Sequence, residues 1–108
     1  MSYDVCLVID AGGPEPVTVG SLNANYTYNC SVMLKEAVGV QLSDMHGWEA
    51  RRVAEILRTA ICDMMTNPAK YEALNPPNGW GDAKGWRAFL QEIHDASMLA
   101  PRATLDVH

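Results

Sequence analysis

The side chains of this chain that are best suited to recognition gather in two short segments. Residues 23–29 are rich in amide, hydroxyl and phenol side chains, and residues 75–82 combine amides with a tryptophan, two prolines and two glycines. The candidate binding residues within them are Asn25, Tyr26, Tyr28, Asn29, Asn75, Asn78 and Trp80. Hydrogen-bonding amides beside flat aromatic rings are typical of binding surfaces. The same residues could also serve the fold, with amides bonding loop backbone and rings lying on the core.

Patterns that would support catalysis are weak by comparison. Gly12-Gly13-Pro14 does not suit phosphate binding, because proline removes one of the amides that a phosphate loop directs at its ligand. His46, His94 and His108 lie far apart, with only isolated carboxylates at helical spacing. Thirteen acidic residues offer no spacing that selects a catalytic pair. We therefore expect no catalytic residue, no metal site and no cofactor.

The three cysteines, Cys6, Cys30 and Cys62, stand at wide, irregular spacing without a Cys-x-x-Cys pair. We expect them to be buried small hydrophobes. Cys62 falls in the C-terminal half of a predicted helix, where the helix dipole opposes a thiolate. A cysteine nucleophile is therefore not expected.

Length and composition limit the partners. A chain of 108 residues is long enough for one hydrophobic core, so residues 1–108 are expected to form a single domain. A formal net charge of −5 opposes docking on duplex nucleic acid or on an anionic membrane. The longest apolar run, Val5 to Ile9, is too short to span a bilayer, and the N-terminus lacks the features of a signal peptide. We expect a cytoplasmic protein.

The ends of the chain predict strands. Residues 3–10 are apolar on both faces, as in a central strand, and residues 103–107 alternate apolar and polar side chains. Between them, the cluster at residues 11–16 predicts a turn, Val17–Val19 a short edge strand, and residues 20–29 an extended segment. The C-terminal strand is expected to pair with the N-terminal strand.

Apolar spacing of three and four predicts the helices. A short helix is expected at residues 32–38, ended by Gly39, and a long one at residues 47–66, with Arg51 and Arg52 on its polar face. A short turn follows Asn67-Pro68, and a last helix begins at Asp82 and runs to about residue 96. The sequence therefore predicts an α+β fold, in which a small two- or three-stranded antiparallel sheet from the chain ends packs against two long helices and one short helix.

Two sequence motifs of this chain are also similar to those of a known protein family. Asn25-Tyr26-Thr27-Tyr28-Asn29 and the run from Leu74 to Asp82, Leu-Asn-Pro-Pro-Asn-Gly-Trp-Gly-Asp, resemble a family of small uncharacterised proteins carried by bacteriophages and actinobacterial genomes. The likeness extends over nearly the whole chain. It implies a phage or prophage setting in the host cytoplasm, which favours proteins that act by binding, and counter-defence is the role that we expect in such a setting. It supplies no activity, cofactor or catalytic residue.

Three functions follow from these observations. The first is a non-enzymatic binding protein that acts on a host protein, as a homo-oligomer. The second is a sponge for a small cyclic nucleotide signal, in which Tyr26, Tyr28 or Trp80 would stack on a base and Arg51, Arg52 or Arg58 would meet phosphate. The third is a small enzyme without a recognisable motif.

Overall fold

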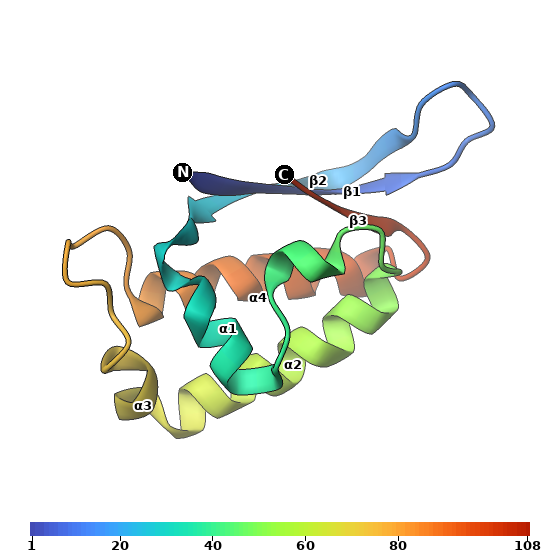
Figure 1. Cartoon of the computed structure of the whole chain (residues 1–108). Coiled ribbons are helices and arrows are strands. Elements are labelled where there is room, and N and C mark those ends of the chain that lie inside the picture. The colour runs from blue at the N-terminus through green and yellow to red at the C-terminus, as the bar shows by residue number, and fades with distance from the viewer.

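One antiparallel sheet and the helices on one of its faces make up the molecule. In a computed structural model that describes all of residues 1–108, the strands β1 (Ser2–Ile9), β2 (Val17–Thr27) and β3 (Thr104–Val107) lie in the order β2-β1-β3. Figure 1 shows the helices on one side of this sheet and the other side open. The predicted α+β fold, with strands from both chain ends, is confirmed.

Four α-helices and two short 3-10 turns connect the strands. The long helices are α2 (Ala50–Thr66) and α4 (Ala83–Leu99), and the short ones are α1 (Ser31–Val38) and α3 (Pro68–Glu72). The 3-10 turns are η1 (Tyr28–Cys30) and η2 (Leu42–Met45). Gly39 ends α1 in the left-handed conformation with φ +79°, as its position in the sequence predicts. The last helix is one turn longer than predicted, ending at Leu99 instead of residue 96.

The core lies between the sheet and the two long helices. Strand β1 contributes Tyr3, Val5 and Leu7, which alternate along the strand and so share one face. The apolar stripes of α2 and α4 meet this face, and Trp86, in the first turn of α4, is fully buried with its ring 6.1 Å from that of Tyr3. This packing fixes the start of α4, and with it the loop that precedes the helix.

The outer edge of β3 is covered by the segment that leads into α2. The Leu105 amide donates to the Trp48 carbonyl at 2.9 Å, and the Gly47 amide donates to the Leu105 carbonyl at 2.8 Å. These bonds hold Gly47 to Glu49 extended, with an isolated bridge between Glu49 and Thr104. Helix α2 therefore begins at Ala50, and the prediction of a helix from residue 47 was wrong at this end.

Strand β2 is longer than its sequence predicts, because a bulge lets it continue through Gly20. Ala24 pairs with Val5 and Val19 pairs with Leu7, so the four residues 20–23 lie opposite Cys6 alone. Gly20 adopts φ +72°, which suits glycine, and Leu22 turns into the core. The predicted short strand and the extended segment are thus one edge strand with a kink, which ends at Thr27; the prediction of extended backbone was wrong for Tyr28 and Asn29, which lie in η1.

The cysteines are less uniform than predicted. Cys30 is buried and Cys6 is half-buried on the open face of the sheet, but Cys62 is exposed on α2. The prediction of three buried cysteines was wrong for Cys62, which lies on the solvent side of its helix instead of in the apolar stripe.

Candidate functional site

The two segments singled out in the sequence lie against each other. The Tyr26 hydroxyl accepts a hydrogen bond from the Asp82 amide at 3.1 Å and lies 3.4 Å from the Asp82 carbonyl, to which it can donate. The Asn29 side chain donates to the Trp80 carbonyl at 3.4 Å. The end of β2 and the loop before α4, separated by about fifty residues of chain, therefore form one structural unit.

The loop from Asn75 to Asp82 is held by its own side chains. The Asn75 side-chain oxygen accepts from the Ala83 amide at 2.7 Å, and the Asn78 side-chain oxygen accepts from the Trp80 amide at 2.9 Å. Asp82 caps α4 by accepting from the Gly85 amide at 2.7 Å. Asn75 and Asn78, predicted as binding residues, thus bond the backbone and fix the shape of the loop.

Gly81 also brings the loop close to the rest of the molecule. Its φ of +94° favours glycine, and a Cβ atom at this position would lie 2.7 Å from Thr27 Cγ2 and 3.0 Å from Cys30 Sγ. Gly79 has a similar φ of +75° but faces open space. The glycine at residue 81 therefore permits a close approach, whereas the glycine at residue 79 only permits a turn.

The two tyrosines of the first segment are packed and not free to stack on a ligand. The Tyr26 ring lies 5.6 Å from Phe89 and 6.0 Å from Trp86, and burial raises the pKa of its hydroxyl. The Tyr28 ring lies 4.3 Å from Tyr3. Both rings extend the aromatic core to the start of α4.

Trp80 is the exception, because it remains 69% exposed. It forms one wall of a shallow hollow of about 490 Å³ at the end of the open sheet face. We call this the Trp80 surface; its lining residues are Met1, Ser2, Asn25, Thr27, Asn29 and Trp80. Three predicted binding residues, Asn25, Asn29 and Trp80, meet here. Ser2 and Thr27 were missed, since small hydroxyl residues in a strand carry no distinctive signal before the strand pairing is known.

The polar groups of the Trp80 surface are partly used and partly free. The Asn25 amide nitrogen lies within bonding distance of three acceptors, Ser2 Oγ at 3.2 Å, the Tyr3 carbonyl at 3.0 Å and Asp4 Oδ1 at 2.8 Å. Thr27 Oγ1 accepts from the Asn29 amide at 3.3 Å. The side-chain oxygens of Asn25 and Asn29 accept no hydrogen bond within the chain. The surface therefore offers carbonyl acceptors and hydroxyl donors around one aromatic plane, and no lysine, arginine or histidine side chain lines it.

The arginines proposed for phosphate binding lie elsewhere. Arg51 and Arg52 begin α2, at the opposite end of the helix layer from the loop that carries Trp80 (Figure 1). Arg51 pairs with Glu49 at 3.0 Å, and the Arg52 guanidinium lies 3.8 Å above the Trp48 ring. Arg58 is exposed further along α2. The structure does not bring these cations together with Trp80.

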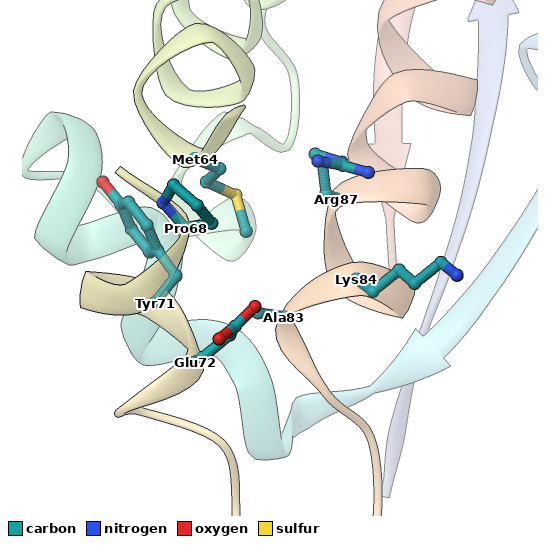
Figure 2. A pocket seen from close by; sticks show the side chains of 7 residues that line it. All are labelled: Met64, Pro68, Tyr71, Glu72, Ala83, Lys84 and Arg87. Atoms are coloured by element: carbon teal, nitrogen blue, oxygen red, sulfur yellow. The ribbon is translucent and has the colours of Figure 1, made fainter. Parts of the chain in front are cut away.

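A second hollow, between α3 and α4, has basic residues that the sequence did not single out. Figure 2 shows Met64, Pro68 and Tyr71 on one side and Lys84 and Arg87 on the other. The hollow is small, about 150 Å³, and neither cation has an ion-pair partner. The Glu72 carboxylate points toward Ala83 in the first turn of α4, where a negative charge is favourable. The Glu72 charge thus favours the start of α4 beside α3.

The Tyr71 hydroxyl ties α3 to α2 beside this hollow by donating to the Asp63 carboxylate. This hydrogen bond lowers the pKa of Asp63, with further contributions from Lys70 and Asn67. Burial, together with the carboxylate, raises the pKa of Tyr71. The pair fixes the position of the short helix.

Another cluster missed by the sequence pattern lies on the open sheet face. The Cys6 thiol donates to Asp106 at 3.5 Å, and Asp106 also lies 2.8 Å from His108 and 3.7 Å from His46. Burial raises the pKa of Cys6, and the Asp106 carboxylate adds to the effect. A thiol whose neighbour is a carboxylate is poorly suited to act as a nucleophile. Burial likewise raises the pKa of Cys30.

Comparisons with known proteins add no assignment to this geometry. No protein-family model, no curated protein and no solved structure matches the chain. Within the chain, no three His, Cys, Asp or Glu side chains are arranged to hold a metal ion. None of the helices combines the length and apolar character needed to cross a membrane.

Proposed function

We propose that this chain is a binding protein that acts without catalysis and engages a host protein through the Trp80 surface. The observation that carries the proposal is the exposure of Trp80, at 69%, on a loop whose backbone is fixed by Asn29 and Asn78. A tryptophan held in place loses little conformational freedom when a partner covers it, and tryptophan is enriched among the residues that dominate interface affinity.

The groups around Trp80 suit a protein partner. The free side-chain oxygens of Asn25 and Asn29 can accept from backbone amides, and the hydroxyls of Ser2 and Thr27 can donate to backbone carbonyls. A polar rim around an aromatic anchor is the usual composition of a protein interface. The partner would contact Trp80 through an apolar side chain and the rim through its main chain.

A nucleotide fits this surface less well. No lysine, arginine or histidine side chain lines it to pair with phosphate, and the one charged side chain beside it is the Asp4 carboxylate, 2.8 Å from the Asn25 amide. Stacking would fall on Trp80 alone, because Tyr26 and Tyr28 are packed against Phe89 and Tyr3. The charges and the packing therefore favour a protein over a cyclic nucleotide.

The setting of the proposal comes from the resemblance of the two motifs to small phage and actinobacterial proteins. Under the proposal, the chain works in the cytoplasm of a bacterial host, where a phage product can block a defence protein by covering part of its surface. Nothing in this role requires a cofactor, a membrane or duplex nucleic acid.

Affinity capture from an actinobacterial lysate tests the proposal. Tagged wild-type chain, Trp80→Ala and the matched control Met65→Ala are compared; Met65 is similarly exposed, at 61%, but lies on α2. We expect wild type and Met65→Ala to retain the same host protein, identified by mass spectrometry. In a titration with that purified protein, Trp80→Ala should weaken binding by about tenfold or more.

Two outcomes would overturn the proposal. In the first, no host protein depends on Trp80 for capture. In the second, a panel of cyclic nucleotides raises the melting temperature of wild type and Trp80→Ala abolishes the shift, which would support the nucleotide sponge instead. Turnover of a nucleotide in the same panel would support an enzyme.

A further inference from the structure

The hairpin formed by β1 and β2 extends beyond the helices as an arm. Figure 1 shows the loop between the two strands projecting past the end of the helix layer. Ile9 and Val17 pair across this arm, and they share the face that carries Val5 and Leu7 further along. No helix lies beneath them, so Ile9 is 40% exposed and Val17 is 49% exposed.

An apolar groove lies where the arm leaves the body. It measures about 280 Å³ and is lined mainly by Leu7, Val19, Leu22, Ala96, Leu99 and Ala100. Leu99, the last residue of α4, is 89% exposed, and Met98 beside it is 60% exposed. The arm and the end of α4 thus present aliphatic side chains on both sides of one groove, which is unusual for a surface that faces only water.

The charges beside these aliphatic residues are opposite in sign. Asp10 and Glu15 lie on the arm, and Arg102 lies in the turn after α4; all three are exposed and none has an ion-pair partner. If a second copy is placed with its arm across the end of α4, its acidic residues approach Arg102. The same contact is then repeated by symmetry, as a closed two-fold interface requires.

We propose that the chain forms a two-fold dimer in which the Ile9–Val17 pair of each arm packs on the Leu99 end of α4 in the other copy. Each copy supplies both an arm and an α4 end, and the acidic residues of the arm are complementary in charge to Arg102 beside the α4 end. This inference supplies a surface for the homo-oligomer expected from the sequence. It does not depend on the Trp80 surface, which lies at the opposite end of the molecule (Figure 1).

Sedimentation velocity over a range of chain concentrations tests the dimer. We expect wild type to sediment as a dimer in the micromolar range and Val17→Asp or Leu99→Asp to raise the dissociation constant at least tenfold. Met65→Asp, which places the same charge on the exposed side of α2, should remain dimeric. Circular dichroism checks that the variants fold, as expected for substitutions at exposed positions.

A charge exchange makes the test specific. Glu15→Lys and Arg102→Glu should each weaken the dimer, and the double variant should recover part of the loss because the opposite charges then face each other again. A wild-type chain that stays monomeric at 100 µM, a dimer unaffected by Leu99→Asp, or open-ended assembly in place of a dimer would overturn the proposal. Trp80→Ala should remain dimeric, and Leu99→Asp should still capture the host protein, so failure of one proposal is separable from failure of the other.

Discussion

The two ends of this molecule expose apolar side chains in different ways. At one end, the loop from Asn75 to Asp82 is held by hydrogen bonds between backbone groups and the side chains of Tyr26, Asn29, Asn75, Asn78 and Asp82, and it exposes a single aromatic ring. At the other end, the arm exposes the paired aliphatic residues Ile9 and Val17. A fixed aromatic ring in a polar setting suits recognition of a different protein, whereas aliphatic surfaces beside complementary charges suit self-association.

The largest expected difference is in the free energy of unfolding, between alanine substitutions of two tryptophans that are six residues apart. Trp86 is fully buried in the core, so Trp86→Ala should lower the free energy of unfolding by about 3–5 kcal/mol. Trp80→Ala removes an exposed side chain and should change it by less than about 0.5 kcal/mol. Urea unfolding measures both. A large loss of stability in Trp80→Ala would mean that Trp80 serves the fold, and the contrast between the two ends would fail.

The next comparison concerns the two glycines that flank Trp80. Gly81→Ala combines backbone strain at φ +94° with a contact of 2.7 Å to Thr27, and we expect it to lower the free energy of unfolding by about 2–4 kcal/mol. Gly79→Ala meets only the backbone strain, because nothing lies within 4 Å, and should cost about 1–2 kcal/mol. Equal losses in thermal or urea unfolding would show that the loop is not docked through Gly81.

A smaller effect compares one aspartate from each end. Asp82→Ala removes the cap of α4 and should lower the free energy of unfolding by about 1 kcal/mol, whereas Asp82→Asn, which can still cap, should cost only a few tenths. Asp10 accepts from the Gly12 amide at 2.9 Å in the arm loop, which supports no other element. At a chain concentration low enough for the monomer to predominate, Asp10→Ala should therefore leave the unfolding transition nearly unchanged. A loss as large as that of Asp82→Ala would contradict the view of the arm as a separate projection.

The smallest effect concerns the hydrogen bond between Tyr71 and Asp63, which joins α3 to α2 and lies in neither of the two exposed apolar regions. The pKa of Asp63 is lowered, first by its hydrogen bond from Tyr71, so its ionised form stabilises the folded state. This contribution is fully present above the unfolded-state pKa of about 3.9 and is lost as the pH falls through the lowered value. Asp63→Asn should therefore be less stable than wild type at pH 7, and the difference should shrink below about pH 4. A difference that is independent of pH would show that the carboxylate charge has no part in the tie.

Much of the fold follows from local patterns in the sequence. The stripe of Val53, Leu57 and Met64 predicts the buried face of α2, and Asp82 predicts the start of α4. Two departures arise from long-range pairing, which local patterns do not contain. Residues 47–49 are extended because they bond to β3, and β2 continues through Gly20 because residues 20–23 bulge opposite Cys6.

The candidate site is harder to predict from the sequence than the fold, because it too depends on contacts between distant segments. The two motifs were singled out together, but their contact depends on the close approach of Gly81 to Thr27 and Cys30, which no spacing reveals. Tyr26 and Trp80 are both aromatic residues in polar segments, yet only the tertiary structure shows one packed on Phe89 and the other exposed. The arginines were grouped with them by charge alone, and the fold places Arg52 over Trp48 instead.

Site-specific photo-crosslinking in bacterial cells tests the central claim most directly. A benzophenone amino acid replaces Trp80 in one variant and Met65 in the other, both at exposed positions. We predict that residue 80 forms an adduct with one host protein and that residue 65 does not. The same adducts from both positions, or no host adduct from residue 80, would contradict the assignment of the Trp80 surface as the recognition site.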